Sequence, residues 1–180
     1  MQLLALSGSL RKASYNTAAI EALKMLAPKD IEIIIGKIDE LPLFNPDREA
    51  ERISAVEALK SNLADAKGLI IASPEYAHGI SGPMKNALDW LVSGVEFPDK
   101  PIMLINTSPR ASHALDALRE VLVTMSGHLI DSACIAIPLL GSELDKKGIL
   151  DNAAITSTLK SGLDEFCRQI REPQLNNNGF

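Results

Sequence analysis

The sequence predicts an α/β fold in which helices cover both faces of a parallel sheet. Five short apolar runs alternate with longer segments that have helical periodicity. Most of these runs are apolar throughout rather than alternating, as expected of strands buried on both faces of a sheet. Hydrophobic residues make up 46% of the 180 residues, which is enough for the full core of one domain.

Each predicted strand is a short run rich in aliphatic residues. The five strands are expected at residues 3–7, 31–35, 68–73, 101–106 and 134–137. Because a helical segment separates successive strands, neighbouring strands are expected to be parallel. Five strands in a chain of this length suggest a doubly wound, flavodoxin-like sheet. Its strand order, 2-1-3-4-5, is taken by analogy with that fold.

Each predicted helix has one apolar face. The helices are expected at residues 17–27, 53–66, 83–92, 111–125 and 152–170. In the first of them Ile20 and Leu23 lie on the apolar face, and Pro28 ends the helix. The third helix is apolar on more than one side. Its Trp90 is therefore either a core residue or a contact with another subunit.

The chain is expected to form a single domain over residues 1–172. Residues 173–180 are polar and are expected to be a flexible tail. Residues 38–52 carry two prolines, Pro42 and Pro46, and are interpreted as a long connecting loop. A loop of this length is either functional or a passive cover over the sheet edge.

Composition excludes several classes of function. A net charge of −5 argues against a nucleic-acid surface, and no apolar run approaches the roughly 20 residues that span a bilayer. The N-terminus shows no signal-peptide pattern, so neither nucleic acid nor membrane is expected as a partner, and the cytoplasm is the expected compartment. Cys134 and Cys167 show no metal or redox spacing and are expected to be reduced thiols, with no metal site.

The loop after the first strand is rich in hydrogen-bond donors. It carries the hydroxyls of Ser9 and Ser14, the guanidinium of Arg11 and the amide of Asn16. A helix follows, and the start of a helix offers unpaired N–H groups and the positive end of a dipole. The loop is therefore a candidate phosphate site. The alternative is a capped helix start with a surface arginine.

Two further loops follow strands that are expected to end at the same edge of the sheet. The loop after the third strand, residues 74–82, combines the ring of Tyr76 with two glycines and suits a flat ligand, unless it is an ordinary connection. In the loop after the fourth strand, Ser108 is a candidate donor to a ligand carbonyl. Arg110 either holds negative charge on a ligand ring or is a solvated arginine. His113 is expected to serve packing or a subunit contact.

Two of these segments together resemble one family. The stretch Gly8-Ser9-Leu10-Arg11, with Ser14 and Asn16, and the stretch Pro74-Glu75-Tyr76, followed by residues 82–90, are similar to the two signatures of the NADPH-dependent FMN reductase family. That family includes bacterial chromate, quinone and azo-dye reductases. The resemblance covers about residues 2–170, and the pair of motifs in this order is far more specific than either motif alone.

The resemblance implies that FMN is bound without a covalent link. It places the FMN phosphate on Ser9, Arg11, Ser14 and Asn16. It places the isoalloxazine ring along Pro74, Glu75, Tyr76 and Ala77, largely on main-chain atoms, with Ser108 and Arg110 as further contacts. The chain departs from the family pattern at two points. Many relatives have asparagine at the position of Ala77, and many have a glycine-rich loop where this chain has residues 109–113.

The implied activity is an NAD(P)H-dependent reductase that passes hydride through FMN to quinone-, azo- or flavin-type small-molecule acceptors. NADPH or NADH would be the co-substrate, and the protein would be a homodimer or homotetramer. The flavin carries the chemistry, so no side chain is assigned a catalytic role. Two alternatives remain: a flavodoxin-like FMN electron carrier without its own NAD(P)H turnover, and a flavin-free regulatory or scaffold protein.

Overall fold

A parallel sheet forms the centre of the computed structural model, which describes residues 1–109 and 112–172. The main strands are β1 (Gln2–Ser7), β2 (Glu32–Gly36), β3 (Leu69–Ala72) and β6 (Pro101–Asn106), with the short β7 (His128–Leu129) and β8 (Ile135–Ala136). The order runs β2-β1-β3-β6, and both β7 and β8 pair with β6. The predicted fold and strand order are thus confirmed. Arg110 and the predicted tail at 173–180 lie outside the described residues.

The prediction of five strands is wrong at the last position of the sheet. There, β7 pairs with the beginning of β6, through Pro101 and His128, and β8 pairs with its end, through Ile105 and Ile135. A 3-10 turn, η2 (Asp131–Ala133), separates the two pieces. The predicted strand at 134–137 is therefore only the second half of an interrupted strand.

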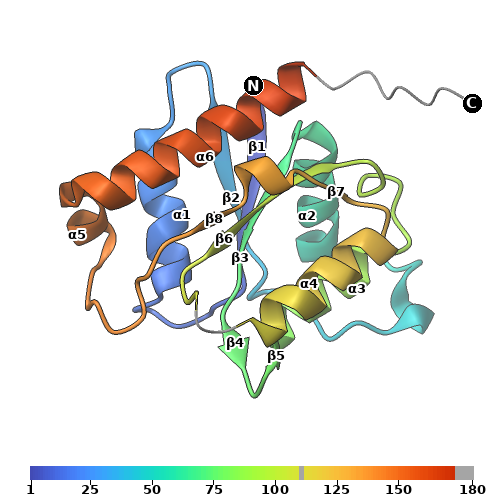
Figure 1. Ribbon diagram of the computed structural model, residues 1–180. Coiled ribbons are helices and arrows are strands. Elements are labelled where there is room, and N and C mark those ends of the chain that lie inside the picture. Colours follow the sequence, from blue (N-terminus) through green and yellow to red (C-terminus); the bar gives the residue numbers. More distant parts are fainter. Residues whose placement is uncertain (110–111, 173–180) are drawn as a thin grey trace, which may run out of the picture.

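Helices cover both faces of the sheet (Figure 1). They are α1 (Tyr15–Leu26), α2 (Ser54–Asp65), α3 (Gly82–Leu91), α4 (His113–Thr124), α5 (Lys146–Asp151) and α6 (Ala153–Arg171). Five of them match the predicted helices within a few residues, and the short α5 was not predicted. The chain has a core on each face: α1, α5 and α6 pack on one side, and α2, α3 and α4 on the other. Alternate residues of β1 serve the two cores, since Leu3 belongs to one and Leu4 to the other.

Trp90 is a core residue, which settles the two interpretations of the α3 sequence. Its side chain is 2% exposed, and its indole N–H donates to the carbonyl of Pro42 at 2.8 Å. The side-chain amide of Asn86 also donates to Pro42, at 2.9 Å, and accepts from the N–H of Phe44 at 2.8 Å. The long connection at 38–52, which contains the short turn η1 (Pro46–Arg48), is therefore fastened to α3.

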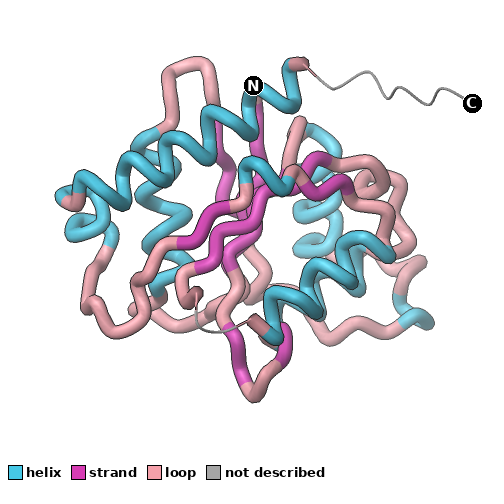
Figure 2. Tube along the Cα trace, viewed as in Figure 1, coloured by secondary structure: helices cyan, strands magenta, loops and turns pink. Residues whose placement is uncertain are grey.

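The loop after β3 contains a small antiparallel hairpin that was not predicted. Its strands are β4 (Glu75–Tyr76) and β5 (Gly79–Ile80), and Figure 2 shows it projecting beyond the carboxyl edge of the sheet. Among the described residues, no helix is both long and apolar enough to cross a membrane. Both cysteines are free thiols, Cys134 half-buried and Cys167 buried.

Candidate functional site

Three loops gather where β1, β3 and β6 end. Parallel strands have their carboxyl ends at the same edge, and ligands of open α/β sheets bind beyond that edge. The loops comprise residues 8–14, 73–81 and 107–112, apart from 110–111, which are not described. The structure thus brings together the three segments that were predicted to form a site.

The first loop presents a row of free N–H groups. Ser14 caps α1, because its hydroxyl accepts from the N–H of Thr17 at 3.2 Å. The five consecutive backbone N–H groups of residues 12–16 donate to no acceptor in the part of the chain that the structure describes. They lie at the positive end of the α1 dipole, so the local structure suits a doubly charged anion.

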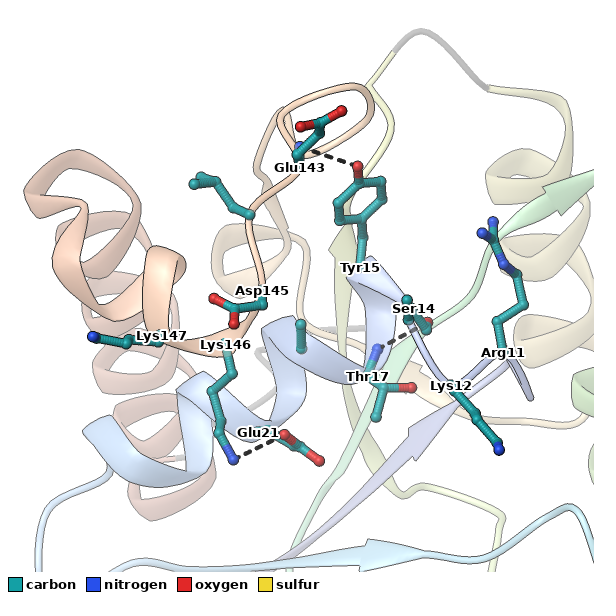
Figure 3. Close-up of a pocket in the computed structure, with 13 residues that line it drawn as sticks. Arg11, Lys12, Ser14, Tyr15, Thr17, Glu21, Glu143, Asp145, Lys146 and Lys147 are labelled. Carbon is teal, nitrogen blue, oxygen red and sulfur yellow. Dashed lines mark hydrogen bonds and ion pairs between the residues drawn. The ribbon is translucent and has the colours of Figure 1, made fainter.

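Two of the predicted phosphate ligands also have structural roles. The hydroxyl of Ser9 is 3.4 Å from the N–H of Arg11 and accepts from it, and the Ser9 residue is 8% exposed. Asn16 is 5% exposed, and its side-chain oxygen accepts from the hydroxyl of Thr107 at 3.0 Å. Asn16 therefore joins the first loop to the third. The side chain of Arg11 is exposed and extends from the loop (Figure 3).

The first and second loops meet at Gly8. The hydroxyl of Ser81 is buried and donates to the carbonyl of Gly8 at 2.6 Å. A Cβ on Gly8 would lie 2.4 Å from the hydroxyl oxygen of Ser73 and 2.9 Å from that of Ser81. The close approach of the two loops therefore depends on a residue without a side chain.

The turn of the β4–β5 hairpin consists of Ala77 and His78. Both residues have positive φ, 49° and 59°, as the two-residue hairpin turn of type I′ requires. Asparagine is favoured at the first position of such a turn, where this chain has alanine. Tyr76, next to the turn, is 49% exposed and offers a ring at the open edge.

The carboxylate of Glu75 contacts helix α4 and the turn of its own hairpin. Its Oε2 accepts from the N–H of Ala114 in α4 at 2.9 Å, and its Oε1 lies 3.1 Å from Nδ1 of His78. The hydrogen bond from Ala114 is the main reason why the pKa of Glu75 is lowered, and His78 adds to it. The imidazoles of His78 and His113 meet edge to face, with ring centroids 4.6 Å apart. Sequence reasoning missed this cluster, because the partners are 39 residues apart.

The third loop is described only in part. The N–H of Ser108 donates to the side-chain oxygen of Asn106 at 2.9 Å, so this N–H is used within the loop, while the Ser108 side chain remains half-exposed. Arg110 lies outside the described residues, and its predicted ring contact stays a prediction.

A cavity of about 500 Å³ adjoins the first loop and was not predicted (Figure 3). It lies between the start of α1 and residues 143–147, a stretch whose periodicity gave no signal. The phenol oxygen of Tyr15 accepts from the N–H of Glu143 at 3.2 Å, and Lys146 pairs with Glu21 at 3.1 Å. Four basic and three acidic side chains line it, so its charges nearly balance.

Comparison with known proteins gives matches over most of the chain. The family model for NADPH-dependent FMN reductases matches residues 1–139. An NAD(P)H-dependent FMN reductase of Pseudomonas aeruginosa is 32% identical, over 97% of this chain and 91% of the relative. A 2-hydroxy-1,4-benzoquinone reductase of Burkholderia sp is 31% identical, over 92% and 93% of the two chains.

A solved structure has the same fold over nearly the whole chain. A flavoenzyme NAD(P)H:(acceptor) oxidoreductase from Paracoccus denitrificans aligns with a TM-score of 0.83 and 26% identity, and the alignment covers 95% of this chain and 97% of that one. The match to the family model spans well over half of the chain, and the first two relatives align over nearly their full lengths. The chain therefore belongs to the NADPH-dependent FMN reductase family.

Proposed function

We propose that this protein binds FMN without a covalent link and uses NADPH or NADH to reduce quinone-, azo- or flavin-type acceptors. The observation that carries the proposal is the row of free N–H groups at residues 12–16, in a loop at the same edge of the sheet as the loop that carries the exposed ring of Tyr76. The names of the relatives, an FMN reductase and a benzoquinone reductase, support the same class of reaction.

The first loop has the chemistry to hold the phosphate of FMN. Free backbone N–H groups at the start of α1 and the cationic side chain of Arg11 are complementary to a dianion. The hydroxyls of Ser9 and Ser14 are further donors at the same place. Since Asn16 uses its oxygen on Thr107, only its N–H groups remain for the phosphate.

The hairpin and the third loop would border the flavin ring. Residues 74–77 offer main-chain groups and the half-exposed ring of Tyr76, and Ser108 lies in the loop after β6. A ring contact of Arg110, which lies outside the described residues, is part of the proposal. When bound, FMN supplies a ring that accepts hydride from NAD(P)H and gives an electron pair to the acceptor. The residues of the chain orient the partners in this exchange. No acidic or basic side chain is assigned to the hydride step.

The experiment that tests the proposal is a flavin absorbance spectrum of the purified protein, followed by titration with NADPH and NADH in the presence of a quinone. We expect bound FMN and quinone-dependent oxidation of at least one of the nicotinamides. Absence of FMN binding at saturating FMN, with no NAD(P)H oxidation, would refute it. FMN binding without NAD(P)H oxidation would instead indicate an electron carrier.

The variant Arg11→Ala tests the phosphate contact. A hydrogen bond to a charged group contributes about 1.5–3 kcal/mol, so the Kd for FMN should rise about 10- to 100-fold. The Kd for riboflavin, which has no phosphate, should stay within about twofold. Arg52→Ala, which removes an exposed arginine far along the chain, is the control and should change neither value. Equal losses for FMN and riboflavin would contradict the assignment.

The assembly is part of the proposal. We expect a homodimer or homotetramer, as the family resemblance implies, and light scattering coupled to size-exclusion chromatography measures it. The buried position of Trp90 means that its ring does not supply the subunit contact. A monomeric mass at micromolar concentration would refute this part without touching the flavin chemistry.

A further inference from the structure

We propose that Glu75 is a positioning residue for the flavin-ring end of the site. Its carboxylate, together with the imidazoles of His78 and His113, holds the β4–β5 hairpin against the first turn of α4 and thereby fixes the place of Tyr76. The inference rests on the proposed function, because the ring end matters only if a flavin binds there.

The side chain of Glu75 is partly shielded from water. It is 14% exposed, and a shielded carboxylate is stable only if its oxygens are paired. Each oxygen has one partner: Oε2 accepts from the N–H of Ala114 at 2.9 Å, and Oε1 lies 3.1 Å from the His78 ring. Both ends of the carboxylate are therefore engaged, one by α4 and one by the hairpin turn.

Helix α4 depends on this carboxylate for its cap. The residue at its N-cap position, Ser112, makes no side-chain hydrogen bond to the first turn. Glu75, from the preceding crossover, supplies the missing acceptor and places negative charge at the positive end of the helix. A cap normally comes from the helix's own sequence. Here it comes from the hairpin, so the start of α4 and the hairpin are held as one unit.

The two histidines add a second contact between the same elements. His78 belongs to the hairpin turn and His113 is the first residue of α4, and their rings pack edge to face at 4.6 Å. The hairpin has only two residues in each strand, and such a small hairpin has little stability of its own. These side-chain contacts with α4 therefore help to hold it in position, together with the packing of Ile80 on the core and the hydrogen bond from Ser81 to Gly8.

The consequence of this arrangement falls on Tyr76. Neighbouring side chains of a strand point to opposite faces, so a strand that directs Glu75 toward α4 directs Tyr76 away from it. The ring of Tyr76 is 49% exposed, and it has no aromatic partner among the described residues. The carboxylate thus controls the position of a ring that it does not touch, at the ring end of the site.

The test compares Glu75→Ala and Glu75→Gln with a control variant, Glu120→Ala. The carboxylate of Glu120 lies on α4 itself, is exposed, and has no ion-pair partner among the described residues. Loss of a charge-assisted hydrogen bond corresponds to about a tenfold effect. For Glu75→Ala we expect the Kd values of FMN and riboflavin to rise together by about tenfold. We also expect the KM for quinone to rise more than kcat falls, and the visible circular dichroism of the bound flavin to change. Glu75→Gln keeps an oxygen for Ala114 and should restore most of the affinity. Glu120→Ala should behave as wild type.

A second measurement is independent of flavin. Amide hydrogen exchange in the flavin-free protein should become about tenfold faster, both in the hairpin at 76–80 and in the first turn of α4, in Glu75→Ala. If Glu75→Ala does not fold, the variant His78→Ala, which removes the exposed partner of Oε1, takes its place in the comparison. Unchanged exchange in both segments, or a loss of affinity for FMN but not for riboflavin, overturns the inference. A wild-type protein that binds no FMN would refute the proposed function, and the exchange result would still report on the cap.

Discussion

Replacing Ala77 by asparagine should stabilise the protein. Ala77 has φ of 49°, and an ordinary L-residue in this left-handed region costs roughly 1–2 kcal/mol. Asparagine tolerates this conformation and is favoured at the first position of a type I′ turn, so it should recover about half of that cost, or about 0.5–1 kcal/mol. For a chain of this size the melting temperature should rise by about 1–4 °C.

Urea unfolding followed by far-UV circular dichroism measures this change, with two companion variants. Ala77→Gly relieves the same strain but also raises the conformational entropy of the unfolded chain. Its net effect on the free energy of unfolding should therefore lie close to zero. Ala117→Asn makes the same substitution at an exposed position inside α4 and should destabilise the fold by about 0.5 kcal/mol. If Ala77→Asn destabilises as much as Ala117→Asn, position 77 does not adopt the left-handed conformation in solution, and the reasoning fails.

Three other changes test other parts of the structure. Gly8→Ala places a methyl group 2.4 Å from a serine oxygen and should lower the free energy of unfolding by about 1–3 kcal/mol and weaken FMN binding, as urea titration and flavin fluorescence would show. Thr107→Val leaves the buried oxygen of Asn16 without its donor and should destabilise by about 1–3 kcal/mol in the same urea assay. The pKa of Glu165 is lowered to about 2, chiefly by hydrogen bonds from Arg168, so its stabilising effect is complete above about pH 4.5 and is lost as pH falls toward 2. Glu165→Gln should therefore be less stable than wild type at pH 7, and the difference should shrink on acidification; an unchanging difference would contradict the pairing.

The order of the sheet was predictable because buried parallel strands are nearly continuous apolar runs. The interrupted last strand was not predictable. Residues 128–129 follow Gly127 and make only two pairs with β6. This two-residue strand is too short to show a strand pattern in the sequence. The fifth apolar run was visible, but nothing in it showed that η2 would break the strand in two.

The donor-rich loop before α1 was predictable because its parts are local in the sequence. A strand, a polar loop and a helix lie next to each other in sequence, and Ser14 caps the helix that directly follows it. The role of Glu75 was not predictable, because its partner Ala114 comes from another crossover. Trp90 shows the same limit: apolar residues on several sides of α3 did not reveal that the loop at Pro42 would cover one of them.

The hydrogen bonds that fasten residues 42–44 to α3 also divide the long connection into two parts with different tolerance for engineering. Up to Phe44 the chain is held by Asn86 and Trp90, and a change of length there would break three hydrogen bonds. From residue 45 to 52 the chain is mostly exposed. Doubling the length of a flexible loop costs only about 0.6 kcal/mol. A peptide tag or a new pair of chain ends between Glu49 and Ala50 should therefore leave the sheet and its three loops in place.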